Sequence, residues 1–226
     1  MAGKIKSTAV MPAATREALL EAATAIFARR GFAATTVREI CETAGANIAA
    51  INYHFRDKES LYREVLTHAL HCARQKYPPH LGTTSQSPPD ERLRAFVESF
   101  LLRIFDESRH AWHGQLMSRE MIAPTAALDH LVTKDIRPMA DVLHGIVREL
   151  MGAKAGAEAV RLCSLSIVSQ CLFYHHCRPV LERLFPKMKL NAKSAAHLAE
   201  HITHFSLSAI RPSARTRTKA KATRRS

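Results

Sequence analysis

The chain contains 226 residues, 46% of them hydrophobic, and carries a formal net charge of +13 at pH 7. Only 6% of the residues are aromatic and eight are glycine, a composition that argues against a turn-rich all-β protein and favours an all-α fold. No apolar run approaches the ~20 residues of a membrane span and no signal peptide opens the sequence, so we expect a cytoplasmic protein with no membrane partner.

The two ends of the chain are basic. Residues 1–13 include two lysines and a proline, and we expect a disordered basic arm that either contacts DNA or is simply solvated. Residues 211–226 contain seven of the 33 basic residues and no acidic residue. Because this segment has no apolar face to bury, we expect a disordered basic tail that raises only non-specific affinity for DNA.

Residues 14–76 are expected to form one domain made of short helices. Its first predicted helix extends from Ala13 or Ala14 to Arg30, where Gly31 ends it. A supporting helix begins near Lys58 and ends near Gln75. The segment between these two helices carries the most informative pattern in the chain.

Residues 36–55 have the pattern of a helix-turn-helix. Four apolar residues recur at the i, i+3, i+4, i+7 spacing of an amphipathic helix: Val37, Ile40, Cys41 and Ala44. Thr36 with Glu39 fits an N-terminal capping box, Gly45 suits a left-handed C-cap, and Asn47 suits the N-cap of a second helix that ends near Phe55. Two helices joined so closely cross steeply, and the second can lie in the major groove of B-DNA.

Further residues of this half match a known family in register. They are Gly31-Phe32, Thr35-Thr36-Val37, Ile40, Ala44-Gly45, Tyr53-His54-Phe55, Lys58 and Leu61. In this series the chain resembles the TetR family of bacterial transcriptional repressors. The resemblance implies a three-helix DNA-binding domain with a linking helix, followed by a larger helical domain for ligand binding and dimerisation, with about nine helices in all. It also implies double-stranded operator DNA as a partner.

The start of the second helix is expected to read the operator. We assign base contacts to Arg38, Asn47, Ile48, Ala49 and Asn52. The Asn52 amide can pair with adenine N6 and N7, the Arg38 guanidinium can pair with guanine O6 and N7, and Ile48 and Ala49 can contact a thymine methyl group. Many relatives carry Ser, then Lys or Arg, then Gly where this chain has Asn47, Ile48 and Ala49, so few long donors point into the groove.

Phosphate contacts are assigned through the resemblance. The matching positions are Thr36, Tyr53, His54 and Lys58. Lys58 at a helix N-terminus opposes the helix dipole, an unfavourable placement that a phosphate would offset. For Tyr53, packing in the core is the alternative.

Residues 77–90 are rich in proline, serine and threonine and predict a linker. Residues 91–210 would then form the ligand-binding and dimerisation domain. Its predicted helices extend from Pro88 to about Ser108, from Ala111 to Ile122, from Pro124 to Leu150 with a kink at Pro138, from Ala157 to Cys177 where Pro179 stops it, and from Ala192 to Ile210.

Residues 157–177 are apolar on nearly every face. Together with the last helix they predict an intermolecular four-helix bundle, as the TetR resemblance also implies, so we expect a homodimer through the last two helices. The alternative is the central core helix of a monomer. The segment Ser166–Pro179 also resembles the CecR-like branch of the family, which implies efflux or transport genes as targets and small organic inducers as ligands.

A small organic inducer requires a pocket among the helices of the second domain. The candidate lining is Phe100, Phe105, Trp112, Met117, Met121, Phe173, Tyr174 and His175. Aromatic and methionine residues at helical spacing also serve as plain core, which is the alternative for this whole set.

Histidines and cysteines raise the question of a metal. Two groups have spacings that can chelate, His197 with His201 and His204, and His110 with His113. No Cys-x-x-Cys motif or acidic ligand cluster accompanies them, so we predict neither a metal nor a cofactor. The five cysteines are scattered and are expected to be reduced and inert.

The favoured function is therefore a repressor that a small-molecule inducer releases from a palindromic operator. One alternative is a non-specific architectural DNA binder driven by the basic tail, and another is a helical protein whose helix-turn-helix is incidental. No Ser-His-Asp order, phosphate-binding glycine loop, paired catalytic carboxylates or HExxH motif is present, so no enzyme is predicted.

Overall fold

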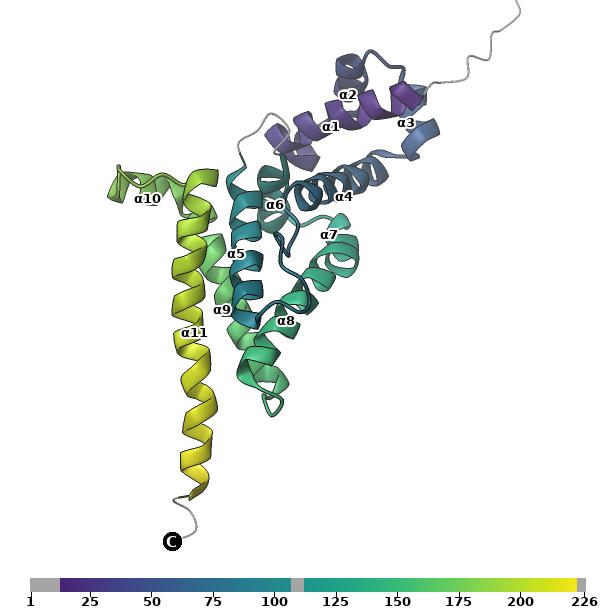
Figure 1. Cartoon of the computed structure of the whole chain (residues 1–226). Coiled ribbons are helices and arrows are strands. Elements are labelled where there is room, and N and C mark those ends of the chain that lie inside the picture. Colours follow the sequence, from purple (N-terminus) through teal and green to yellow (C-terminus); the bar gives the residue numbers. More distant parts are fainter. Residues whose placement is uncertain (1–12, 107–111, 223–226) are drawn as a thin grey trace, which may run out of the picture. The chain divides into compact units, whose positions relative to one another are not determined.

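The structure is a computed structural model that describes residues 13–106 and 112–222, with side chains described for residues 15–106 and 112–210. Within these residues it is all-α (Figure 1). The first part of the chain contains α1 (Ala13–Ala34), α2 (Val37–Ala44), α3 (Ile48–Phe55), α4 (Lys58–Lys76), α5 (Pro89–Phe105) and α6 (Trp112–Ile122). The remainder contains α7 (Ala127–Leu131), a π-helical turn (Val132–Ile136), α8 (Arg137–Met151), α9 (Ala157–His176), α10 (Arg178–Leu184) and α11 (Ala192–Ala222).

The contacts divide the chain into two compact units that are each discontinuous in sequence. The first unit comprises residues 13–69 and 115–128, and the second comprises residues 70–106, 112–114 and 129–222. Helices α4 and α6 therefore contribute residues to both units. Residues 77–90, which we predict to be a linker, lie by their contacts within the second unit and contain turns up to Pro88.

The first unit has a core built by α1 to α4. Fully buried side chains face inward from each of these helices, among them Leu19, Ala23, Phe27, Ile40, Ile51, Leu61 and Val65. Helix α1 is interrupted at Gly31, whose φ of 78° and ψ of 174° are not helical. The predicted end at Gly31 is therefore correct for the regular part of α1, because a glycine adopts such a conformation without the steric penalty of a Cβ atom.

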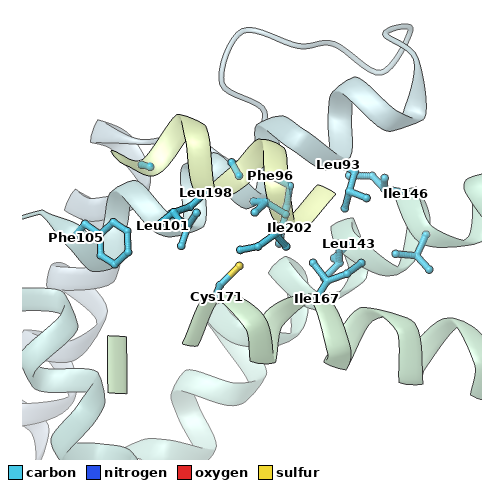
Figure 2. Close-up of a cluster of buried hydrophobic side chains, with 14 of the residues drawn as sticks. Leu93, Phe96, Leu101, Phe105, Leu143, Ile146, Ile167, Cys171, Leu198 and Ile202 are labelled. Atoms are coloured by element: carbon cyan, nitrogen blue, oxygen red, sulfur yellow. The ribbon is translucent and has the colours of Figure 1, made fainter. Parts of the chain in front are cut away.

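The second unit has a core formed by α5, α8, α9 and α11. Figure 2 shows how leucine, isoleucine and phenylalanine side chains of these helices meet, with Cys171 of α9 among them. Leu93, Phe96, Leu101 and Phe105 from α5 lie in the same cluster as Leu143 and Ile146 from α8, Ile167 from α9, and Leu198 and Ile202 from α11. Among the helices that the structure describes, none combines the length and apolar character needed to cross a membrane.

The structure corrects the prediction of one long kinked helix after Pro124. The segment instead contains α7, the π-helical turn Val132–Ile136 and α8. Pro138 lies in the first turn of α8, where a missing amide donor is tolerated. The α-helical geometry is thus interrupted by the π-helical turn, which ends just before the proline. Wide π-turns are a recognised cause of helix kinks.

Helix α10 was not predicted. Pro179 does follow the end of α9, where Cys177 has a φ of −93° and a ψ of 9°. The same proline then occupies the first turn of α10, because its fixed φ suits a helix start as well as a helix stop. With α7 and α10 included, the described residues contain more helices than the expected nine.

The carboxyl-terminal segment also differs from the prediction. Helix α11 continues as far as Ala222, whereas we expected residues 211–226 to be disordered. Alanine, arginine and lysine, which are frequent in this segment, are among the residues with the highest helix propensity, so an apolar face is not required for the helix to continue. Residues 1–12, which contain the predicted basic arm, and residues 223–226 lie outside the described residues.

Candidate DNA-binding surface and core of the second unit

Three polar or glycine residues fix the geometry of α2 and α3. The Thr36 hydroxyl accepts a hydrogen bond from the Glu39 amide at 3.2 Å, which caps the start of α2. Gly45 ends α2 with a φ of 61°, in the left-handed region. The Asn47 side-chain oxygen accepts a hydrogen bond from the Ala49 amide at 3.0 Å and caps α3. The predicted caps of the helix-turn-helix are therefore confirmed at all three positions.

Helix α3 presents one exposed face. Ala50, Ile51 and Phe55 are buried against the unit. Four other residues of the helix are exposed, namely Ile48 and Ala49 in its first turn and Asn52 and Tyr53 in its second half. Tyr53 is 76% exposed, so the alternative in which it packs in the core is wrong. The residues assigned to base contact on α3 thus share one surface that no other part of the first unit covers.

Arg38 lies on α2 and is also exposed. Its Nε donates a hydrogen bond to the Glu42 carboxylate at 2.8 Å, and this ion pair raises the pKa of Arg38. Because both side chains are exposed, the pair is weak and can exchange for another acceptor. Arg38 is therefore accessible as the predicted base-contacting cation, although it has a partner within its own helix.

Two of the residues assigned to phosphate contact have interactions that the sequence did not predict. The Nε2 atom of His54 is buried and has no hydrogen-bond partner, so this nitrogen does not face the solvent. The Lys58 ammonium lies 4.3 Å from the centre of the Phe32 ring, and burial lowers the pKa of Lys58. A cation–π contact therefore stabilises Lys58 at the start of α4 without a phosphate. Contacts of Thr36, Tyr53, His54 and Lys58 with DNA stay predictions.

Residues 115–128 contribute to a buried polar network in the first unit. Glu120 of α6 is 0% exposed. The Tyr62 hydroxyl of α4 donates to one of its oxygens at 2.9 Å, and the amide and hydroxyl of Thr125 donate to the other at 2.8 and 2.9 Å. Burial and the bond to Glu120 raise the pKa of Tyr62. Charge-assisted hydrogen bonds thus hold α6 against α4 within this unit.

Arg119, the neighbour of Glu120, binds the end of α1. Its Nε donates to the carbonyl oxygen of Ala28 at 2.6 Å, and its Nη2 donates to the carbonyl oxygen of Arg29. These are among the last carbonyls before the break at Gly31, and a guanidinium satisfies helix-end carbonyls well. Sequence analysis missed both Arg119 and Glu120 because their partners lie about 60 to 90 residues earlier in the chain.

The predicted ligand pocket is not assembled as one cavity. Phe105 belongs to the core of the second unit, and the partly buried Phe100 and Tyr174 pack against it. Trp112 and His175 are half-buried residues of the same unit. Met117 and Met121 belong to the first unit, and Phe173 is exposed. Phe105 and Tyr174 therefore agree with the alternative interpretation, in which these residues form part of the hydrophobic core.

Two pockets are found elsewhere in the second unit. The first has a volume of about 340 Å³ and is lined by Pro79, His80, Thr83, Thr84, Ser85, Arg92, Val142 and Ile146. The second has a volume of about 440 Å³ and is lined by Arg178, Glu182, Pro186, Met188, Lys189, Leu190 and Asn191. Neither pocket contains a residue of the predicted lining.

A cluster of buried polar groups lies in the second unit, and only His175 among them belongs to the predicted pocket lining. Arg103 of α5 is 6% exposed and donates from Nη1 to the Ser99 hydroxyl at 2.9 Å and to the Tyr77 carbonyl at 3.3 Å. Burial lowers the pKa of Arg103 to about 10. Its position in the sequence could have indicated this burial, because Arg103 follows Phe96 and Phe100 at the spacing of one helix face that is otherwise apolar.

Other members of this cluster come from α6 and α9. The Nδ1 atom of His113 is buried without a hydrogen-bond partner, and burial together with the charge of Arg103 lowers the pKa of His113 to about 4. Burial also lowers the pKa of His175 and raises that of the Cys171 thiol to about 12. Cys171 is therefore protonated at neutral pH and unreactive as a nucleophile.

Within the described parts of the chain, no group of three or more His, Cys, Asp or Glu side chains is placed to hold a metal ion. His201 and His204 are exposed on α11, and His110 lies outside the described residues. All five cysteines are free thiols, as predicted.

Comparisons with known families match both halves of the chain. Residues 19–65 match the model described as bacterial regulatory proteins of the tetR family. Residues 89–210 match the C-terminal domain of the HTH-type transcriptional dual regulator CecR. The second match alone covers more than half of the chain.

Curated relatives match over part of their length. The chain is 38% identical over 93 residues to the HTH-type transcriptional repressor KstR2 of Mycolicibacterium smegmatis, which covers 41% of this chain and 45% of that protein. It is 32% identical over 155 residues to the HTH-type transcriptional dual regulator CecR of Shigella flexneri, which covers 64% of this chain and 66% of that protein. The chain thus matches about half to two thirds of the length of these relatives.

Solved structures share the fold over most of the chain. A TetR-family transcriptional regulator from Bordetella parapertussis 12822 has a TM-score of 0.61 and 20% identity, covering 85% of this chain and 93% of that one. AibR in complex with isovaleryl coenzyme A and operator DNA has a TM-score of 0.62 and 15% identity, covering 84% of this chain and 97% of that one. At these identities the comparison supports the fold alone.

Proposed function

Because this chain belongs to the TetR family of bacterial regulators, with a CecR-type C-terminal domain, we propose that it is a dimeric repressor that a small organic inducer releases from a palindromic operator. The family is one of DNA-binding transcriptional regulators rather than enzymes.

The exposed face of α3 is the observation that carries DNA recognition. It presents the Asn52 amide between apolar contacts from Ile48 and Ala49, with Tyr53 at its end. The helix has 8 residues and is about 12 Å long, so it fits within a single passage of the major groove. One such helix makes few base contacts, and a two-fold symmetric pair doubles them.

Exposed apolar residues on the last long helices support a dimer. Leu165 of α9 is 57% exposed and Phe205 of α11 is 59% exposed. Leu162 and Phe173 are also exposed on α9, and their helical spacing places them on the same side of the helix as Leu165. Exposure of such an apolar surface to water is unfavourable, and a second copy of the chain would cover it.

Inducer action follows from differential affinity. In one conformation of the dimer, the spacing of the two α3 helices does not fit the two half-sites. A ligand that binds the second unit more tightly in this conformation shifts the population away from the DNA-bound form. AibR is seen with isovaleryl coenzyme A and operator DNA in its solved complex. The efflux or transport genes that the CecR-like resemblance implies are the first candidates for regulated targets.

Footprinting of the full chain on the DNA that flanks its own gene tests this proposal. We expect protection of a palindromic site, with half-sites about one helical turn apart, that survives an excess of scrambled DNA. Protection that spreads over all sequences and vanishes uniformly with salt would instead indicate the architectural binder. A screen of small organic compounds for loss of protection then tests induction.

A further inference from the structure

We propose that Arg103 and His113 form an anion-binding site in the core of the second unit, and that it takes the carboxylate of an inducer with an apolar body. This inference rests on the proposed function, because it names the chemical class of the inducer. Arg103 and His113 are not among the residues of the predicted pocket lining, whereas the neighbouring Phe100 and Phe105 are.

Arg103 is a buried cation whose partners are neutral. Both of its hydrogen bonds leave from Nη1 and end on uncharged oxygens, the Ser99 hydroxyl and the Tyr77 carbonyl. Within the described residues no carboxylate pairs with it. A charge removed from water is costly unless an opposite charge accompanies it, and a guanidinium matches a carboxylate through parallel hydrogen bonds.

Each acidic side chain of this region has a cationic partner of its own, although Oδ2 of Asp135 is buried without a hydrogen bond. Asp135 accepts a hydrogen bond from Arg74, and Asp106 accepts one from Lys76 at 2.7 Å. Arg74 has its own counter-ion, yet its charge still acts on Arg103 and lowers the pKa of Arg103 further. The electrostatic environment of Arg103 therefore favours an added negative charge.

His113 supplies the second, independent observation. Its Nδ1 atom is buried and has no partner in the structure, although buried polar atoms are nearly always hydrogen-bonded. Gly114, the next residue, lies against His175 and α5: a Cβ atom added there would be 3.2 Å from His175 Cε1 and 3.8 Å from the carbonyl oxygen of Ile104, the neighbour of Arg103. This packing places His113 beside the cluster, and the charge of Arg103 helps to lower the pKa of His113. In the appropriate tautomer Nδ1 donates an N–H to an oxygen of the ligand.

The charge balance selects a monoanion. Burial holds the His113 imidazole neutral at pH 7, so Arg103 contributes the single uncompensated positive charge. A carboxylate neutralises that charge, whereas a phosphate dianion would leave an excess negative charge in an apolar core. Phe100, whose ring centre lies 5.5 Å from the guanidinium carbon, and the buried Phe105 and Cys171 provide apolar surroundings for the rest of the ligand.

Arg103 is buried, and neither Arg103 nor His113 lines the two pockets described above, so we expect the ligand to separate the side chains of this cluster as it binds. Such opening gives the ligand a preference for one conformation of the unit. That preference is what an inducer requires.

Trp112, the one tryptophan of the chain, is next to His113 and serves as a built-in reporter. We suggest titrating the full-length protein with octanoate, 1-octanol and octyl phosphate at pH 7 and following Trp112 fluorescence. Octanoate should bind at least ten times more tightly than octanol or octyl phosphate. Equal binding of octanoate and octanol would overturn the proposal, and so would a preference for octyl phosphate.

Two variants test the assignment of the residues. Arg103→Met keeps an unbranched side chain without the charge and should weaken octanoate at least tenfold while leaving octanol unchanged. Arg94→Met, on the exposed side of the same helix, should bind octanoate like the original chain. His113→Asn should weaken octanoate severalfold and provides a second answer if Arg103→Met does not fold, as circular dichroism would show. Unchanged octanoate binding in a folded Arg103→Met or His113→Asn protein would contradict the site.

The fluorescence measurement does not involve DNA, so it separates this inference from the proposed function. Carboxylate binding that depends on Arg103 but never releases a footprinted operator supports the site and contradicts induction through it. Operator binding with no carboxylate preference supports the regulator and overturns the ligand class.

Discussion

Asn52 is the side chain on the exposed face of α3 that can identify a base by two hydrogen bonds. We expect Asn52→Ala to weaken operator binding by about 1–3 kcal/mol and to leave binding to scrambled DNA unchanged. Fluorescence anisotropy with both DNAs at several salt concentrations measures the difference. Gln75→Ala, which removes an exposed amide from α4, is the matched control and should affect neither DNA. Equal losses on both DNAs for Asn52→Ala would mean that another residue reads this base.

His113 should make the second unit sensitive to acid. Its pKa is about 4 in the folded protein instead of the usual 6.5, so between these values the unfolded chain binds a proton that the folded protein excludes. Stability is therefore fully present above pH 6.5 and is lost as pH falls toward 4, by at most about 3 kcal/mol for this group.

Urea unfolding at pH 7 and pH 4.5 checks this sign. The loss on acidification should be smaller in His113→Asn than in the original chain, because Asn cannot take up the proton. His201→Asn, at an exposed position of α11, should retain the full loss. An unchanged loss in His113→Asn would show that other groups cause the acid sensitivity.

Residues that act within one turn of their neighbours could be predicted from the sequence, and residues with distant partners could not. Thr36, Gly45 and Asn47 cap helices through backbone groups at most three or four positions away. Glu120 looks like a surface residue in the sequence, since its burial depends on partners that only the tertiary fold brings near. For Arg103 the sequence offers only its place on an apolar helix face, which does not reveal the Tyr77 carbonyl as a partner. For the same reason the predicted pocket combined residues from two different units.

At the scale of elements, two glycines should respond in opposite ways to the same substitution. Gly45 ends α2 with a φ of 61°, whereas Gly145 lies inside α8, and an added Cβ would meet no other atom within 4 Å at either position. Gly45→Ala should therefore cost about 1 kcal/mol through backbone conformation alone. Gly145→Ala should stabilise the protein by about 0.5–1 kcal/mol, since it improves helix propensity and restricts the unfolded chain.

Thermal or urea unfolding of the two variants measures both effects under one condition. A stabilised Gly45→Ala protein would mean that the turn between α2 and α3 does not need a left-handed residue. In that case the close joining of the two helices would have to be explained by Asn47 and the packing of Ile51 instead.

The elements that the sequence did not predict share one physical cause. Proline was treated as a helix stop or a kink, yet Pro138 and Pro179 both lie in the first turn of a helix. A proline allows either outcome, and the choice depends on whether the segment after it packs. Leu181 of α10 is buried, a tertiary contact that sequence periodicity over seven residues is too short to reveal.

At the scale of the whole molecule, the exposed apolar surface of α9 and α11 predicts how operator binding depends on assembly. Leu165→Glu should place a charge in the proposed subunit contact and convert the dimer into monomers. Operator affinity should then fall by roughly 100-fold or more, because the two half-sites are no longer bound together. Sedimentation and anisotropy measure the two effects.

Ile122→Glu provides the control for this prediction. Ile122 is 83% exposed at the end of α6 and belongs to the first unit, so the substitution introduces the same charge outside the proposed contact. We expect a dimer with normal operator affinity. A dimer that survives Leu165→Glu would place the subunit contact on another surface.

The discontinuous DNA-binding unit has a consequence for the order in which the protein is made. Residues 70–114 are synthesised before residues 115–128, which complete the first unit. Until then, the Tyr62 hydroxyl lacks its hydrogen-bond acceptor Glu120, and the carbonyls at the end of α1 lack their donor Arg119. The N-terminal helices are therefore expected to reach their final form only after residues 70–114 of the second unit have been synthesised. We therefore expect that a gene fragment encoding residues 1–76 is not an independent unit of exchange between regulators, because it lacks residues 115–128, which contribute Arg119 and Glu120.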